Sequence, residues 1–346
     1  MNQLSDISVL DIGPCRTNQT SAEAFQSMIT LAQQAEEWGY KRYWMAEHHN
    51  IPATVASNIP VLAGIIAAKT TSIRLGGCLL LPNYPPYLIS EQAAILEACY
   101  PGRIDLSIGS ASGSDWITTN ILRGCRRNSE DFTTSVQNLI ALLNPKGSSV
   151  TFEDNNLPYI IKATPRALKK PSIWSWGTST EDAYMAAKLG IPFMLCYHIT
   201  GNDIQRAIKI YRQNFIPNDQ CPEPKVLASV IVVSADTKEE AERLAKPQLM
   251  QMCSFRAGDI KDAQLLVEEA ENIAFPEQYR SMESILRKTW IIDNPEMAAE
   301  KVKKLAKQLD INEIMINPYA AAYKDDATGR SANREYILKK MSDYLI

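Results

Sequence analysis

The stretch "PSIWSWGTSTEDAYMAAKLGIPFMLCY" at residues 171–197 contains two short apolar runs separated by one helical pattern. The runs at 171–177 and 191–197 have the length and composition of buried strands. The segment between them, at 179–190, places apolar residues three and four positions apart, as one face of a helix does. A strand, a helix and a second strand in this order predict two parallel strands joined by a crossover.

The same alternation extends through the chain in both directions. We predict strands at 7–13, 41–47, 72–81, 103–109, 171–177, 191–197, 225–235 and 311–318, and helices at 21–39, 59–70, 87–99, 129–144, 179–190, 203–215, 237–252 and 294–310. Segments at approximately 145–170 and 250–290 interrupt the series. Eight such units favour a (β/α)8 TIM barrel with inserted segments over the alternative, an open doubly wound sheet. Without internal repeats or linker composition, we expect a single domain covering 1–346.

Composition limits the classes of function that the chain can have. Hydrophobic residues make up 45% and charged residues 22% of the chain, as in globular proteins. The formal net charge is −3 without a basic block, which argues against nucleic acid as the main partner. We find no apolar run of about 18 residues and no secretory signal pattern. The seven cysteines form no C-x-x-C pair, so we expect reduced thiols in a cytoplasmic protein without a membrane span.

A barrel of this kind places its active site at the C-terminal ends of the strands. Glu47, His48 and His49 follow the second predicted strand, and side chains of this kind suit general acid–base work or contact with a bound ring. The alternative is a solvated strand end whose side chains bond to neighbouring loops. A metal site is not expected, because adjacent strand residues point to opposite faces and the only other histidine is His198.

Two further strand ends carry candidate ligand contacts. Gly76 and Gly77 lie in the third predicted strand, where glycine indicates either a close approach of backbone or ligand, or a kink that helps to close the barrel. Thr178, Ser179 and Thr180 begin the helix after the fifth strand. Their hydroxyls and free N–H groups favour an anion such as phosphate, and ordinary helix capping is the alternative. The loop "IGSASGSD" at 108–115 consists of small residues that can surround a flat ligand.

Four motifs in order resemble those of the bacterial luciferase-like, flavin-dependent monooxygenase family, over nearly the whole chain. They are "GYKRYWMAEHHN" (39–50), "LLLPNYPPYLISEQAAILEACYPGRIDLSIGSASGSD" (79–115), "WGTSTEDAYMAAKLGIPF" (176–193) and "DNPEMAAEKVKKLAKQLDINEIMI" (293–316). The resemblance implies a TIM barrel with inserted segments. It also implies an enzyme that takes reduced FMN from a separate flavin reductase, activates O2 as a flavin C4a-peroxide and oxygenates a small organic substrate. Relatives commonly dimerise across the second and third helices, which implies a homodimer.

Carried over by motif, the resemblance assigns roles to individual residues. His48 falls at the position of a catalytic histidine and Glu47 at that of a glutamate near the flavin. The residues implied to contact the cofactor are Gly76, Gly77 and Cys78 behind the isoalloxazine ring, and Gly177, Thr178, Ser179 and Thr180 around the phosphate.

One position departs from the family pattern. Ser110 stands where relatives commonly have an arginine that helps to hold the phosphate. The absence of this arginine should weaken FMN binding by roughly 1.5–3 kcal/mol, unless Arg123, Arg126 or Arg127 compensates. Two alternatives therefore remain beside the monooxygenase: a deazaflavin-dependent oxidoreductase on the same barrel, and a flavin-binding relative without turnover.

Overall fold

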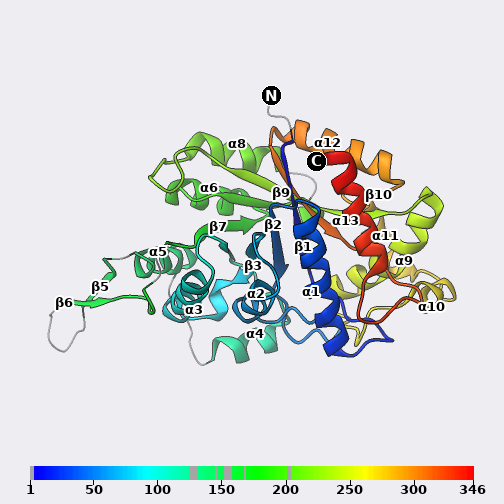
Figure 1. The fold of residues 1–346 in the computed structure, drawn as a ribbon, viewed down its shortest axis with the longest axis horizontal. Coiled ribbons are helices and arrows are strands. Elements are labelled where there is room, and N and C mark those ends of the chain that lie inside the picture. The colour runs from blue at the N-terminus through cyan, green and yellow to red at the C-terminus, as the bar shows by residue number, and fades with distance from the viewer. Residues whose placement is uncertain (1–3, 125–130, 145, 152–157, 167–168, 201–203) are drawn as a thin grey trace.

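A ring of parallel strands forms the centre of the molecule (Figure 1). The computed structural model describes residues 4–124, 131–144, 146–151, 158–166, 169–200 and 204–346. The barrel strands are β1 (Asp6–Asp11), β2 (Arg42–Ala46), β3 (Arg74–Leu80), β4 (Ile104–Gly109), β7 (Ser172–Gly177), β8 (Phe193–Cys196), β9 (Val226–Ser234) and β11 (Glu313–Pro318). Each pairs in parallel with the next, and the pairing of β8 with β9 and of β11 with β1 closes the ring. The predicted (β/α)8 barrel is confirmed, because an open sheet would leave two unpaired edges.

Helices surround this barrel and connect its strands. They are α1 (Ser21–Glu37), α2 (Ile59–Ala67), α3 (Pro86–Cys99), α5 (Phe132–Leu142), α6 (Thr180–Leu189), α8 (Ile204–Asn214), α9 (Lys238–Arg256) and α12 (Pro295–Leu309). All eight overlap helices predicted from the sequence. A further helix, α13 (Ala332–Leu345), was not predicted. It follows the last strand and packs beside α1, so that the first and last helices are neighbours (Figure 1).

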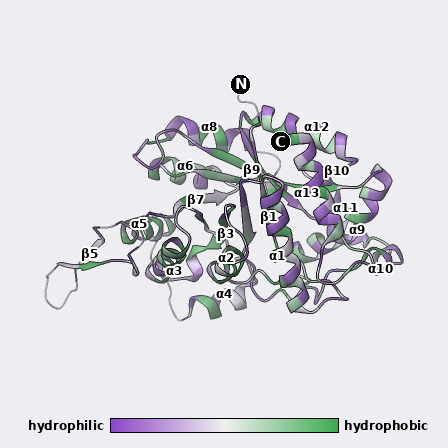
Figure 2. Cartoon of the chain, viewed as in Figure 1, coloured by the Kyte–Doolittle hydropathy of each residue, from purple (hydrophilic) through white to green (hydrophobic). Residues whose placement is uncertain are grey.

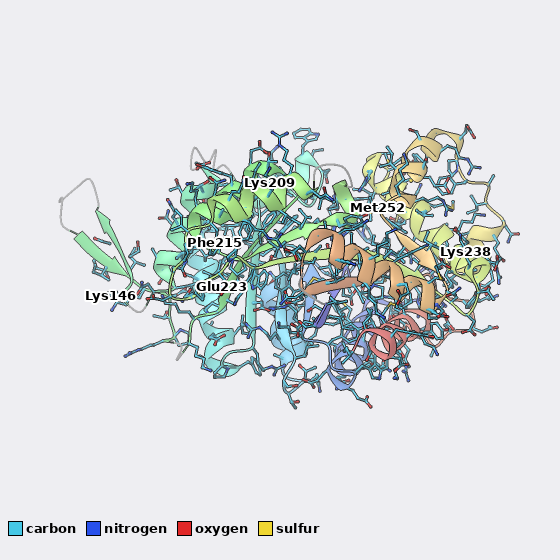
Figure 3. All side chains as sticks on the ribbon, turned by 90° about the horizontal axis from the view of Figure 1, so that it is seen from above. Lys146, Lys209, Phe215, Glu223, Lys238 and Met252 are labelled. Carbon is cyan, nitrogen blue, oxygen red and sulfur yellow. The ribbon has the colours of Figure 1, made fainter. Side chains whose placement is uncertain are left out.

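The two predicted interruptions contain additional short elements. The first holds the antiparallel pair β5 (Ser148–Thr151) and β6 (Pro158–Ile161), which extends away from the barrel. The second holds α10 (Val267–Glu271), η2 (Glu277–Tyr279) and α11 (Arg280–Arg287), followed by β10 (Ile291–Asp293), which pairs with the end of β9. Lys146 near the hairpin and Lys238 on α9 lie toward opposite ends of the molecule (Figure 3). Shorter elements are η1 (Leu81–Asn83), α4 (Trp116–Arg123) and α7 (Tyr197–Thr200).

Apolar residues fill two separate layers. The larger layer lies between the outer faces of the strands and the helices, and the hydropathy colouring shows apolar residues along both (Figure 2). The smaller layer lies inside the barrel and consists of Leu10, Trp44, Cys78, Trp174, Met194, Cys196, Leu227 and Met315. Because successive residues of a strand face opposite sides, β2 contributes side chains to both layers.

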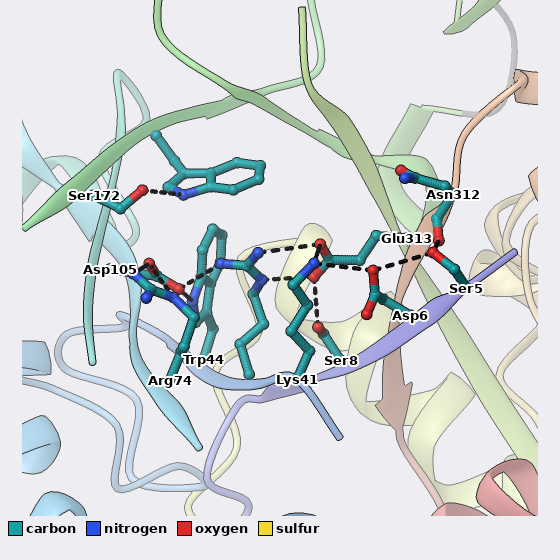
Figure 4. Close-up of polar contacts among 12 residues, drawn as sticks. Ser5, Asp6, Ser8, Lys41, Trp44, Arg74, Asp105, Ser172, Asn312 and Glu313 are labelled. Atoms are coloured by element: carbon teal, nitrogen blue, oxygen red, sulfur yellow. Dashed lines mark hydrogen bonds and ion pairs between the residues drawn. The ribbon is translucent and has the colours of Figure 1, made fainter. Parts of the chain in front are cut away.

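The N-terminal end of the barrel interior is charged instead of apolar. Arg42 on β2 donates from Nη1 to Asp105 on β4 at 2.7 Å and from Nε to Glu313 on β11 at 2.6 Å (Figure 4). Arg74 on β3 also pairs with Asp105, and the Ser8 hydroxyl donates to Glu313 at 2.6 Å. The two carboxylates raise the pKa of Arg42 above its ordinary value in spite of burial. All the charges of this network have partners, as buried charges require.

Within the described ranges, no helix combines the length and the apolar character needed to span a membrane.

Replacing Arg42 with methionine should destabilise the fold by about 3–5 kcal/mol, because Asp105 and Glu313 would remain buried without their cation. Equilibrium urea unfolding measures this loss. As a matched control, Arg243→Met removes an exposed arginine that pairs with Glu240 and Glu271, and should change stability by about 1 kcal/mol or less. An equal effect of both substitutions would contradict a structural role for the buried network.

Candidate active site

A cavity of about 460 Å³ lies at the C-terminal ends of the barrel strands. This is the end at which barrels of this class place their active sites, and the volume suits a small organic ligand. Strand ends form its floor, and α9 forms one wall, where Figure 3 labels Met252. The wall is mainly apolar and includes Leu10, Ile12, Leu80, Met252 and Phe255.

Glu47 joins the end of β2 to the end of β3 through a carboxylate whose two oxygens both accept hydrogen bonds. One of its oxygens accepts from the Leu80 amide at 3.0 Å, and the other accepts from the Tyr84 hydroxyl at 2.6 Å and from His49 Nε2 at 2.5 Å. Glu47 is 3% exposed, although it borders the cavity. His49, whose role the sequence left open, therefore bonds to Glu47. This part of the motif fits the alternative of side chains that bond to neighbouring loops.

His48 borders the cavity with one ring nitrogen free. Its Nδ1 lies 3.1 Å from the Ala46 carbonyl oxygen, which can only accept, so Nδ1 carries the proton in the neutral ring. Nε2 is then the acceptor, and the described residues provide no partner for it. The ring packs edge-on against Phe255, with 5.9 Å between centroids. Burial lowers the pKa of His48, with a smaller opposing effect from the Ala46 carbonyl, so the ring is a neutral base near neutral pH.

His198 is a second histidine at the cavity, from the end of β8, and it was not among the predicted site residues. Its Nδ1 lies 3.0 Å from the Ser229 hydroxyl, and burial lowers its pKa to about 4. Its position directly after a predicted strand was the available signal. Arg256 and Phe255 also border the cavity. They lie at the end of α9, within the second predicted interruption at 250–290.

Cys78 lines the cavity, whereas Gly76 and Gly77 do not. A side chain at Gly76 would place Cβ 1.8 Å from the Asp105 carbonyl oxygen, and one at Gly77 would place it 2.1 Å from that of Met45. Both glycines therefore allow close approach of neighbouring strands, which is one of the two interpretations given above. Burial raises the pKa of Cys78 well above its ordinary value, so this thiol is protonated.

The start of α6 has its own anion in the place proposed for a phosphate. Asp182 Oδ2 accepts from the Thr178 amide at 3.3 Å, the Ser179 amide at 3.2 Å and the Ser179 hydroxyl at 2.7 Å. A side chain on Gly177 would lie 2.4 Å from the same oxygen. The Thr180 hydroxyl donates to Glu181 at 3.1 Å. Ser179 and Asp182 thus form a capping box in the place expected to bind phosphate. Of Gly177, Thr178, Ser179 and Thr180, Thr178 alone lines the cavity.

Ser110 contributes a neutral group to the same region. Its hydroxyl donates to Asp182 Oδ1 at a long 3.4 Å. Of the three arginines named above as compensating for the missing family arginine, Arg123 donates to Asn83, and Arg126 and Arg127 lie outside the described residues. Among the described residues that line the cavity, Arg256 is the only Lys or Arg. Across all the residues that the structure describes, no cluster of three His, Cys, Asp or Glu side chains could hold a metal ion.

Comparison with known proteins gives a consistent result over most of the chain. The family model described as luciferase-like monooxygenase matches residues 8–311. A luciferase-like monooxygenase of Escherichia coli K12 is 30% identical over 90% of both chains. An N-acetyl-S-alkylcysteine monooxygenase of Bacillus subtilis is 32% identical over 90% of this chain and 91% of its own. The crystal structure of apo-MsnO8 has a TM-score of 0.81 and 27% identity, and the match covers 99% of this chain and 98% of that one.

The buried His198 makes stability depend on pH. The folded pKa of His198 is about 4 against an ordinary 6.5, so the unfolded chain binds a proton that the folded chain excludes. Stability should therefore fall as the pH is lowered from 7 toward 4, by on the order of 2 kcal/mol at pH 5 from His198 alone. Urea unfolding at several pH values measures this. His198→Gln should remove the part of this loss of stability that comes from His198. A pH dependence of stability identical to that of the wild type would contradict the role given to His198.

Proposed function

The chain belongs to the luciferase-like monooxygenase family, and from this we propose that it is a flavin-dependent monooxygenase. It takes a reduced flavin from a separate reductase and uses O2 to oxygenate a small organic substrate. The observation that carries this proposal is the mainly apolar cavity at the strand ends, bordered by His48, whose Nε2 has no partner among the described residues. Its volume suits a small organic molecule, and its position is that of active sites in this fold.

The reduced flavin supplies the electrons that O2 requires, and the chain supplies a dry, oriented site. Leu10, Leu80, Met252 and Phe255 give the cavity an apolar wall, which disfavours water beside the reacting groups. His48 can accept a proton at Nε2, because its Nδ1 proton is held by the Ala46 carbonyl and the ring is neutral. We assign His48 the role of general base.

Glu47 has a different role in this proposal. Its carboxylate oxygens are engaged by Leu80, Tyr84 and His49, so it is a positioning residue that fixes the ends of β2 and β3. The adjacent His48 is held at the cavity wall by the same strand end.

His48→Asn should reduce oxygenated product per O2 consumed by at least about a hundredfold, because the proton acceptor is lost. Flavin binding should change little. The measurement uses the purified chain with a flavin reductase, isotopically labelled O2 and a panel of N-acetyl-S-alkylcysteines, aldehydes and ketones, with label in product and hydrogen peroxide read in parallel. Lys209→Ala, on the exposed face of α8, is the matched control and should leave both readouts unchanged.

The same experiment separates the competing functions. Turnover that needs a reduced deazaflavin and incorporates no label would identify a deazaflavin-dependent oxidoreductase. Flavin binding with peroxide release alone, over the whole panel, would identify a relative without turnover. Undiminished label incorporation by His48→Asn would remove His48 from the mechanism but leave the reaction class intact.

We also propose a homodimer through α2 and α3. Helix α2 has the sequence IPVLAGIIA, which is apolar on all faces, and such a helix is normally buried on all sides. Here Val61 and Ile65 are 56% and 45% exposed, and Leu88 and Ile95 of the adjoining α3 are also exposed. In Figure 2, α2 carries the colour of hydrophobic residues. A second copy of the chain would cover this surface.

Ile65→Glu should weaken dimerisation by at least about a hundredfold, because association would bury an unpaired charge. Sedimentation velocity over a range of protein concentrations measures this. Ile216→Glu introduces the same charge at an exposed isoleucine outside α2 and α3 and should have no effect. A monomeric wild-type chain, or a dimer that Ile65→Glu leaves unchanged, would rule out this interface.

A further inference from the structure

The start of α6 does not fit the phosphate of FMN, and this disagreement bears on which flavin the site accepts. We propose that the chain binds its flavin without the terminal phosphate, as riboflavin, and discriminates against FMN through Asp182. This inference rests on the proposed function, since it concerns the cofactor of the same cavity.

Four of the donors that would bind a phosphate are already engaged by carboxylates of the same helix. Asp182 Oδ2 occupies the Thr178 and Ser179 amides and the Ser179 hydroxyl, and Glu181 occupies the Thr180 hydroxyl. A phosphate could take these donors only by displacing Asp182, whose capping contacts hold the first turn of α6. It would also lie beside two negative charges, Glu181 and Asp182, in the first turn of the helix.

In the described part of the chain no cation pairs with Asp182, and the one cation that acts on this turn, Arg206, acts on the neighbouring Glu181. Every partner of Asp182 in the described part of the chain is a neutral donor, including the Ser110 hydroxyl. Ser110 occupies the position at which relatives commonly have an arginine. Ser110 in place of an arginine removes a cation, and Asp182 adds an anion. Both differences weaken the binding of a phosphate.

A neutral tail suits the same groups. Oδ1 of Asp182 has a single long contact, with Ser110, and can accept a further hydroxyl proton. The Thr178 hydroxyl lines the cavity, and the described residues give it no partner. An acidic residue that accepts from a ribose hydroxyl selects NAD over NADP in dinucleotide-binding folds, because it repels the additional phosphate. The ribityl chain of riboflavin presents hydroxyls of the same kind.

The test compares riboflavin and FMN, which share one fluorescent ring, by fluorescence quenching on the full chain, and repeats the titration with both reduced flavins under anaerobic conditions. The wild-type chain should bind riboflavin at least about tenfold more tightly than FMN. Raising the salt concentration should improve FMN binding and leave riboflavin binding unchanged, because salt screens the repulsion. A merely structural role of Asp182 would not produce this difference.

Asp182→Asn keeps the size and an acceptor oxygen of the side chain and removes its charge. It should bind FMN at least about tenfold more tightly than the wild type does, with riboflavin affinity within about threefold. Adding Ser110→Arg should improve FMN binding further. Glu23→Gln is the matched control, since it removes the same charge from the corresponding capping-box position of α1, at a residue that does not line the cavity. The ratio of the two affinities in each protein is independent of any loss of folded material.

Two results would overturn the inference while leaving the proposed function intact. One is FMN binding as tightly as riboflavin, with a ratio that Asp182→Asn does not change. The other is a preference for FMN that disappears in Arg256→Gln, which would place the phosphate at the cavity's arginine instead of at α6. If neither flavin binds below millimolar concentration in either redox state, the proposed function itself fails.

Discussion

The guanidinium of Arg42 bridges Asp105 and Glu313, two carboxylates on strands that do not neighbour β2. The three residues come from alternate strands, as the layers inside such barrels do. The guanidinium is planar and its N–H donors point in fixed directions, so it bridges the two carboxylates in one geometry. This ties the positions of β2, β4 and β11 to each other. Because one-residue slippage would turn Arg42 away from the interior, the network favours a single register.

That register determines what reaches the other end of the strands. With Arg42 and Trp44 inside the barrel, the next strand-end residues of β2 are Glu47 and His48, at the border of the cavity. Glu47 then bonds to Leu80 and Tyr84, which joins β2 to the segment after β3. The charged N-terminal end and the apolar C-terminal end thus have separate functions: the first fixes the strands, and the second leaves space for a ligand.

The cavity environment acts on its titratable groups mainly through burial. His48 and His198 have lowered pKa values and Cys78 has a raised one, so each favours its neutral form. Neutral side chains and an apolar wall suit chemistry that water would divert. At α6 the balance is different, because Asp182 already supplies the negative charge that a helix N-terminus attracts.

The barrel and the position of its active end followed from the sequence, because strands and helices have distinct apolar periods and parallel strands end on one side. Within the motif at Glu47, His48 and His49, the residues gave the candidates, and the family resemblance implied roles for Glu47 and His48 but not for His49. Tertiary contacts distinguish the three side chains, since Tyr84, Leu80 and His49 bond to Glu47 and no described residue bonds to Nε2 of His48. The structure also brought in His198 and Arg256, which reach the cavity through chain segments distant in sequence. Asp182 shows the same difference: its residue type was visible beside Ser179, but only the folded helix turn shows that its carboxylate occupies the amides expected to bind phosphate.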